Sequence, residues 1–404
     1  MDMRSDVCVI GNGAVGKAAA LGLAQAGLSV TLLVPGAAGQ GARAPAPAAQ
    51  PDGWDVRVYA LNHAAQALLA SLRVWDAMDA SRIAEVDGMA VQGDGGQNAG
   101  RLDFDAYGAR TGTLAWIVED SNLNHALDAA LRFAPSLKIV SGRAVRLEQD
   151  AGSATVVLEN GDRFAAGLVV GADGAHSWVR GQCDIGLDYR SYGQRAVVAN
   201  FETELPHHGV AHQWFTGVQG IVALLPLPGQ RVSLVWSAPE ALARALMEEP
   251  LSQLASRLEA LPGQPFGRLT PLQPESVKAL PLVLIRPHAI TAPRVALVGD
   301  AAHVVHPLAG HGMNLGFADV AALLDILAGR GAERDCGDAR LLGQYARARK
   351  EDILLMQVAT DALERLFSAN FEPLRVVRNI GLNLVNRLPF IKRRLISHAM
   401  GKRL

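Results

Sequence analysis

Three glycine-rich segments carry the residue types and the spacing needed to hold a large anionic ligand. They are GNGAVG at residues 11–16, GADGAHSWVR at 171–180 and GDAAHVVHPLAGHGMNLG at 299–316. Glycine lets the backbone approach a ligand closely, and the free N–H groups at the start of a helix attract negative charge. One such segment alone is a weak signal. The three together, in this order, predict one cofactor site assembled from both halves of the chain.

The first segment lies in a predicted strand–helix–strand unit. An apolar run at 7–10 precedes it, residues 14–26 have helical composition, and residues 30–34 are again β-branched and apolar. This context predicts a dinucleotide-binding turn whose backbone and helix dipole face a pyrophosphate. The residues of the turn are Gly11, Gly13, Ala14 and Gly16.

The second strand of this unit ends without an acidic residue. Folds of this type place a carboxylate there to bind a ribose diol, but this chain has Val34. Either Asp52 or Asp55 substitutes from the following segment, or the ribose contact is missing. Residues 36–53 are rich in alanine, proline and glycine and predict a surface loop.

The third segment is the most specific. An apolar strand at 295–298 delivers Gly299 and Asp300, and a glycine turn then opens a helix predicted over 312–327. A helix start suits the negative charge of a reduced flavin ring, and Asp300 would bond the ribityl chain of that cofactor. The residues expected along the ring are Pro307, Gly310, Gly312, Met313 and Asn314. The alternative is an ordinary strand–loop–helix with a capping aspartate.

Between the glycine segments the pattern changes from helices to strands. Helices are predicted at 61–78 and 122–133, and a β-meander at 143–164 leads to a buried strand at 168–170. Three alternating runs without intervening helices then predict a separate antiparallel sheet. They lie at 196–201, 221–225 and 232–236. Trp214, Phe215 and Trp236 belong to this region and are interpreted as core residues, with an apolar substrate pocket as the alternative.

The composition argues against several partners and sites. A net charge of -1 gives no field that would gather nucleic acid. Three isolated cysteines indicate neither a disulfide framework nor a zinc site, and His303, His306 and His311 lack the ligand arrangement of a metal centre, so no metal is expected. The chain starts without a signal-peptide pattern and has no apolar run near the ~20 residues of a membrane span, which predicts a cytoplasmic protein.

The last part of the chain is strongly basic. After Pro373 it contains no acidic residue, while arginines and lysines alternate with large apolar side chains. An amphipathic cationic segment of this kind binds the inner face of a membrane or a protein partner, and the alternative is a helix packed on its own domain.

The second glycine segment gives the sequence a specific resemblance. Asp173, Gly174, Ser177 and Arg180 match the DG motif of the group A flavoprotein aromatic hydroxylases, the p-hydroxybenzoate hydroxylase type. The chain most resembles the ubiquinone-biosynthesis hydroxylases within that group. Four stretches carry this likeness, which covers essentially the whole chain: DVRVYALN at 55–62, WIVEDSNLNHAL at 116–127, the third glycine segment, and residues 367–401.

The resemblance implies a fold and its cofactors. The expected fold is α/β: a Rossmann-like FAD-binding domain with an inserted, mainly antiparallel β-sheet substrate domain and a helical C-terminal segment. The expected bounds are 1–182 and 278–340 for the FAD-binding domain, 183–277 for the substrate domain and 341–404 for the helical basic segment. FAD is the implied cofactor, NAD(P)H the electron donor and molecular oxygen the co-substrate. The family also implies that Arg57 approaches the flavin and that Asn122 begins a helix on the adenosine side.

The sequence therefore predicts an FAD-dependent monooxygenase that hydroxylates the ring of a polyprenylated phenol in ubiquinone biosynthesis, through a flavin hydroperoxide. Arg57, Pro307 and His311 are expected to border the reacting atoms. The expected partners are this lipophilic prenylphenol, a quinone-biosynthesis protein complex and a membrane surface.

Three positions depart from the family pattern: Val34 replaces the ribose acid, Ser121 an arginine and His311 a glutamine. They motivate an alternative, a non-catalytic member of a quinone-biosynthesis assembly that binds FAD poorly. A related flavin oxidoreductase that reduces isoprenoid chains is a further alternative.

Overall fold

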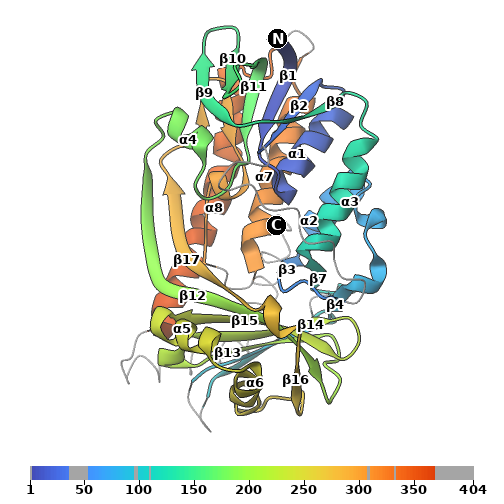
Figure 1. Cartoon of the computed structure of the whole chain (residues 1–404), viewed down its shortest axis with the longest axis vertical. Coiled ribbons are helices and arrows are strands. Elements are labelled where there is room, and N and C mark those ends of the chain that lie inside the picture. Colours follow the sequence, from blue (N-terminus) through green and yellow to red (C-terminus); the bar gives the residue numbers. More distant parts are fainter. Residues whose placement is uncertain are drawn as a thin grey trace.

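The computed structural model describes residues 2–35, 53–94, 99–108, 111–306, 310–331 and 334–368. Within these ranges the chain forms two sheets of eight strands and one of three strands. The first large sheet and its helices make up the upper part of the molecule in Figure 1, and the second large sheet makes up the lower part.

The first sheet has the strand order β18-β19-β11-β1-β2-β8, and the central strands run parallel. A hairpin of β9 and β10 extends β11 with antiparallel pairing. The bounds are β1 Asp2–Ile10, β2 Val30–Val34, β8 Leu137–Ser141, β9 Ala144–Gln149, β10 Ala154–Leu158, β11 Arg163–Gly171, β18 Thr291–Ala292 and β19 Val295–Leu297. The expected unit at 7–34 and the expected meander are therefore present.

The register of this sheet brings the three glycine segments together. Ile10 at the end of β1 pairs with Gly171 at the end of β11, and Gly171 pairs with Leu297 at the end of β19. Because the carboxyl ends of parallel strands share one edge, the three glycine segments leave the sheet side by side.

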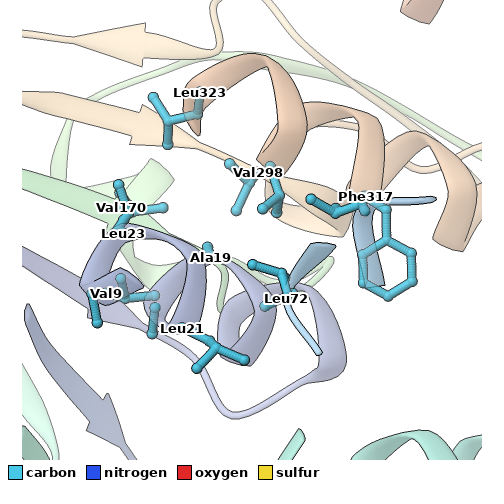
Figure 2. Packing of buried hydrophobic residues seen from close by; sticks show 14 of the residues in the cluster. Val9, Ala19, Leu21, Leu23, Leu72, Val170, Val298, Phe317 and Leu323 are labelled. Atoms are coloured by element: carbon cyan, nitrogen blue, oxygen red, sulfur yellow. The ribbon is translucent and has the colours of Figure 1, made fainter. Parts of the chain in front are cut away.

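Helices cover this sheet and close its core. They are α1 Ala14–Gln25, α2 His63–Ser71, α3 Asp120–Arg132, α4 Trp178–Gln182, α7 His311–Ala328 and α8 Ala339–Ser368, with short 3-10 turns at Trp75–Ala77, Ala80–Arg82 and Gly299–Ala301. Figure 2 shows Val9, Val170 and Val298 packing against α1 and α7, which contribute Leu23 and Phe317. The core explains why these elements form, since each buries its apolar face against the sheet.

The second sheet has the order β16-β12-β15-β14-β13-β5-β6, and β17 also pairs with β12. The bounds are β5 Gly88–Gln92, β6 Arg101–Asp105, β12 Leu187–Thr203, β13 Val210–Phe215, β14 Ile221–Leu227, β15 Arg231–Pro239, β16 Leu269–Leu272 and β17 Lys278–Pro287. Helices α5 Glu240–Glu248 and α6 Leu251–Glu259 cover its outer face, with 3-10 turns at Gly217–Gln219 and Pro274–Ser276. The small sheet, β3 Val58–Leu61, β4 Ile83–Val86 and β7 Ala115–Glu119, packs on its inner face.

The structure differs from the sequence expectation in three places. The second sheet takes in β5, β6 and β17, which lie outside the expected block 183–277. Helix α2 ends at Ser71 and not near residue 78, because Arg73 has a left-handed φ of 58° that turns the chain out of the helix. Helix α8 crosses the expected boundary at 340 and buries Tyr345 in the core of the first sheet.

We predict unequal losses of stability for substitutions at two nearby glycines. Gly11 has a φ of 135°, and a Cβ atom there would lie 2.1 Å from the Ala172 carbonyl oxygen, whereas no described atom lies within 4 Å of a Cβ at Gly13. Gly11→Ala should lower the free energy of unfolding by about 1–3 kcal/mol or more, from backbone strain plus separation of the strand ends. Gly13→Ala should cost less than about 1 kcal/mol. Thermal and urea unfolding of both variants would check this, and equal losses would contradict it.

Candidate functional site

The three glycine segments touch one another at the strand ends. Val15 in the first turn of α1 lies between two glycines of the third segment: a Cβ atom at Gly316 would be 2.7 Å from its Cγ2, and one at Gly299 would be 3.2 Å from its Cγ1. Ala172 of the second segment packs equally closely on the first, since a Cβ at Gly16 would be 3.1 Å from the Ala172 Cβ. The predicted convergence of the segments is thus confirmed for the described residues.

Two helix starts at this edge leave their N–H groups available. Helix α1 begins after Gly13 and helix α7 after Gly310, and neither has a side-chain capping hydrogen bond from the part of the chain that the structure describes. A Cβ atom at Gly13 or at Gly312 would meet no described atom within 4 Å. No described side chain therefore fills the space beside these two glycines, and an anion bound there would satisfy the first N–H groups of the helices.

Asp300 lies in the 3-10 turn Gly299–Ala301, which follows β19. Its side chain is exposed, and yet desolvation by the surrounding protein raises the pKa of its carboxyl group, with His303 and Arg57 opposing the shift. Exposed area combined with desolvation is expected of a group in a recess and not of one on a convex surface. Arg57 is therefore close enough to Asp300 for its charge to oppose the shift.

The second segment presents one carboxylate oxygen without a partner. Asp173 accepts a hydrogen bond from the Val179 N–H through Oδ2 at 3.0 Å, while its buried Oδ1 has no partner among the described residues. Arg180 is buried and donates to two backbone carbonyls, Ala301 at 3.0 Å and Ala175 at 2.8 Å. Its guanidinium group therefore ties the second segment to the Asp300 turn, and burial lowers its pKa.

The segment that carries Arg57, directly before β3, is fixed from both sides. The Asp55 carboxylate accepts hydrogen bonds from the Arg57 N–H at 2.9 Å and from the Ser121 N–H at 3.1 Å. Asn200 of β12 donates to the Asp55 carbonyl at 3.1 Å. Asp55 thus has a structural role here, and Val34 packs against the core of the first sheet.

A buried ion pair supports the same segment and was missed by the sequence analysis. The fully buried Glu119 accepts two hydrogen bonds from Arg82, at 2.6 and 2.9 Å, and a third from the Asp55 N–H at 2.6 Å. The Arg82 guanidinium also lies 4.5 Å from the centre of the Trp54 ring. These contacts join residues far apart in the chain, and no local pattern at Arg82 or Glu119 indicates them.

Two predicted cofactor residues use their side chains for backbone contacts. Asn122 accepts from the Asp79 N–H at 2.9 Å and donates to the Asp79 carbonyl at 3.0 Å. Asn314 donates to the Ala60 carbonyl at 2.8 Å and accepts from the Asn62 N–H at 3.0 Å. Asn122 thereby fixes the start of α3, and Asn314 fixes α7 to the strand that follows Arg57.

The remaining predicted residues are placed as follows. Met313 is partly buried on the core of the first sheet, Gly174 has a φ of 85°, and Ser177 caps α4 by accepting from the Arg180 N–H at 3.0 Å. Pro307 and the His311 side chain lie outside the described residues. The described residues include no cluster of three metal-ligating side chains, and none of their helices is both long and apolar enough to cross a bilayer.

Comparison with known proteins agrees with this geometry. A family model described as FAD binding domain matches residues 4–356. The ubiquinone hydroxylase UbiL of Rhodospirillum rubrum is 35% identical, with 99% of this chain and 90% of the relative covered. The 3-demethoxyubiquinol 3-hydroxylase of Escherichia coli is also 35% identical, with 98% of each chain covered.

Solved structures show the same fold at lower identity. The p-nitrophenol 4-monooxygenase PnpA from Pseudomonas putida superposes with a TM-score of 0.76 at 20% identity, covering 100% of both chains. Klebsiella pneumoniae HpxO, complexed with FAD and uric acid, superposes with a TM-score of 0.72 at 21% identity, covering 99% of this chain and 96% of that one. The chain therefore belongs to the FAD-dependent monooxygenases of the FAD binding domain family, in the group of the ubiquinone-biosynthesis hydroxylases.

Proposed function

We propose that this protein hydroxylates the aromatic ring of a polyprenylated phenol in ubiquinone biosynthesis, with FAD as cofactor, NAD(P)H as electron donor and molecular oxygen as co-substrate. Its two relatives named as ubiquinone-pathway hydroxylases support the reaction. The observation that carries the substrate class is the central part of the inner face of the second sheet, which is turned toward the FAD-binding domain (Figure 1) and carries no charged side chain.

This central part consists of two rows of side chains across four strands. The pairing of β13, β14, β15 and β12 aligns the first row, Gln213, Ala223, Val235 and Val198, and the second, Phe215, Ile221, Ser237 and Ala196. Most of these residues keep 5–8% of their surface exposed, while neighbours on the α5 and α6 side such as Val222 and Leu234 keep 0%. The rows are mainly apolar with two small or uncharged polar groups, which suits a prenylated phenol better than an acid.

The aromatic residues of this sheet divide between its two faces. Trp214 and Trp236 belong to the core under α5 and α6, as the sequence interpretation preferred. Phe215 faces the other way, in a cluster with Ile221 and with Leu366 of α8. Only Phe215 of these three is therefore a candidate for substrate contact.

The roles proposed for the cofactor residues are those that the family resemblance implies, and for the described residues the site geometry supports them. The start of α1, with Gly11, Gly13, Ala14 and Gly16, holds the pyrophosphate. Asp300, which follows Gly299, accepts a hydrogen bond from the ribityl chain. The start of α7, with Gly310, Gly312, Met313 and Asn314, lies along the pyrimidine edge. Asp173, Gly174 and Arg180 shape the second wall, Asn122 orders α3 on the adenosine side, and Arg57, Pro307 and His311 border the reacting atoms.

FAD, when bound, supplies the oxygen chemistry, so the protein's own tasks are binding, orientation and exclusion of water. The start of α7, which no described side chain caps, offsets the negative charge of the reduced ring. Arg57 adds a positive charge near Asp300. The apolar rows hold the ring of the substrate in a dry environment.

A second candidate is the FAD-poor assembly member, and one observation favours it. Val34 cannot form a hydrogen bond to a ribose, and the Asp55 carboxylate already accepts hydrogen bonds from two N–H groups.

The two candidates differ in what the purified protein does. Purified protein that is yellow, oxidises NAD(P)H and hydroxylates a prenylphenol would support the enzyme. Colourless protein that still co-purifies with quinone-pathway proteins would support the assembly member. The intermediate that accumulates after gene deletion identifies the step.

We also infer that the basic segment after Pro373, which lies outside the described residues, brings the protein to an anionic membrane that contains its lipophilic substrate. It combines eight arginines and lysines with large apolar residues and has no acidic residue, so each cation near the surface adds attraction to anionic lipid.

Asp300→Ala should weaken FAD binding about tenfold or more, because a charged hydrogen-bond acceptor is lost from the ribityl chain. Gly13→Ala should also weaken it, by crowding the pyrophosphate, with little effect on folding. FAD content after purification and fluorescence titration of the apoprotein measure both effects. An Asp300→Ala protein that keeps its full flavin content and affinity would contradict the assignment.

Ala223→Phe should raise KM for a prenylphenol roughly tenfold, because the ring fills the centre of the first row. FAD content should stay unchanged. Met247→Phe is the matched control, since Met247 is 40% exposed on α5, on the other side of the sheet. If both variants change KM equally, or neither does, the inner face is not the substrate surface.

Deleting the residues after Pro373 should reduce co-sedimentation with vesicles that contain phosphatidylglycerol, and added salt should reduce binding of the intact chain in the same way. Vesicles of phosphatidylcholine alone serve as the control. Unchanged sedimentation of the truncated protein would rule out the membrane role.

A further inference from the structure

A buried carboxylate beneath the Asp300 turn organises that turn. Asp319 of α7 is fully buried, and its two oxygens meet three donors. The Gly299 N–H donates to Oδ2 at 2.9 Å, His303 Nε2 lies 2.6 Å from the same oxygen, and Arg349 Nε donates to Oδ1 at 2.7 Å. One side chain therefore binds the residue before Asp300 and the residue three places after it.

Helix α8 supplies the cation of this network. Arg349 is 2% exposed, and besides Asp319 it donates to Asp352 at 2.7 Å and contacts the Leu315 carbonyl at 3.4 Å. One turn earlier, the buried Tyr345 hydroxyl donates to the Leu297 carbonyl at 2.7 Å, at the end of β19. Helix α8 is thus attached both to the strand that enters the turn and, through Asp319, to the turn itself.

The electrostatics of the network favour a charged Asp319. Burial raises the pKa of its carboxyl group, but His303 and Arg349 together outweigh burial, so the pKa is lowered overall. Because Asp319 stays ionised, it remains an acceptor for all three donors. Removing Arg349 would leave a buried charge with reduced compensation, and the turn would have to shift to bring water or another donor to it.

The Asp300 turn is held by its own backbone, by Arg180 at the Ala301 carbonyl and by Asp319. Gly299 has a φ of 62°, and its carbonyl accepts from the Ala302 and His303 N–H groups at 2.8 and 3.0 Å, which closes the turn on itself. The direction of the exposed Asp300 carboxylate then depends on how Gly299 and His303 are held. Both are held by Asp319.

We propose that Arg349, acting through Asp319, is a positioning residue that aims the Asp300 carboxylate at the ribityl chain of FAD. This inference rests on the proposed role of Asp300. By this proposal α8 belongs to the cofactor site through Arg349, although none of the proposed cofactor ligands is on α8. The proposal also explains why α8 packs on the FAD-binding domain and is not a separate segment after residue 340.

The test is a double-mutant cycle on FAD affinity, measured by fluorescence titration of the apoprotein with FAD. Arg349→Met should raise the Kd for FAD roughly tenfold in the native background. In the Asp300→Ala background it should change Kd by less than about twofold, because the residue it positions is gone. Arg347→Met, two positions away on the exposed side of α8, should change Kd in neither background.

The outcomes separate the two proposals. If Asp300→Ala alone leaves Kd unchanged, the assignment of Asp300 fails, and this inference fails with it. If Asp300→Ala weakens binding but Arg349→Met weakens it by the same factor in both backgrounds, Arg349 has a merely structural effect and only the inference is overturned. An unchanged Kd in Arg349→Met overturns it as well.

Conservative variants keep the test decisive if Arg349→Met does not fold. Arg349→Lys retains the charge but not the flat donor geometry, and Asp319→Asn retains the shape but not the charge. Far-ultraviolet circular dichroism of the apoprotein checks the fold. The visible absorption bands of bound FAD should shift in Arg349→Lys and in Asp319→Asn but not in Arg347→Met, and native bands in both conservative variants would overturn the inference.

Discussion

The close approach of three backbone segments at one sheet edge is the constraint on which the rest of the structure depends. Gly11 leaves no room for a Cβ beside the Ala172 carbonyl, and Gly16 and Gly316 are nearly as restricted by Gly11 and Val15. Gly13 and Gly312, by contrast, face open space. The glycines thus serve two purposes that the sequence alone does not distinguish. One set lets the segments pack, and the other leaves space where a cofactor's anionic and electron-rich groups can reach the helix starts.

The packing of the segments fixes the charge pattern of the site. Helix α1 follows β1 directly, and Val15 in its first turn packs on Gly316 of α7, so the positive dipole ends of the two helices lie near each other. The charge of Arg57 also acts on Asp300. A cofactor with a pyrophosphate at one end and a ring that gains negative charge at the other matches two helix starts placed in this way. Both helix starts would then gain partners for N–H groups that the described side chains leave uncapped.

Local pattern was enough to predict the strand–turn–helix units, because each is encoded by neighbours: an apolar run, a glycine at a positive φ and a helical stretch. It was not enough for features that depend on distant partners. The ion pair of Arg82 with Glu119 and the carboxylate of Asp319 under the Asp300 turn join separate elements. Asn122 and Asn314 have the polar side chains of ligands but use them to bind backbone groups. Strands β5 and β6 joined the second sheet because β5 pairs with β13, from beyond residue 200, and no local signal marks such a partner.

Val34 and Ser121 both remove a charged side chain that the family pattern places at the adenosine end. Ser121 is buried, and its N–H is bonded to the Asp55 carboxylate. Losing a charged hydrogen bond to the ribose costs about 1.5–3 kcal/mol of FAD binding, which two helix starts and Asp300 at the other segments can offset in part. In the proposed function, a larger share of the FAD binding free energy therefore comes from the contacts to the pyrophosphate and the ribityl chain. The proposed positioning of Asp300 by Arg349 and Asp319 then matters more for FAD affinity, because the contacts at the adenosine end contribute less.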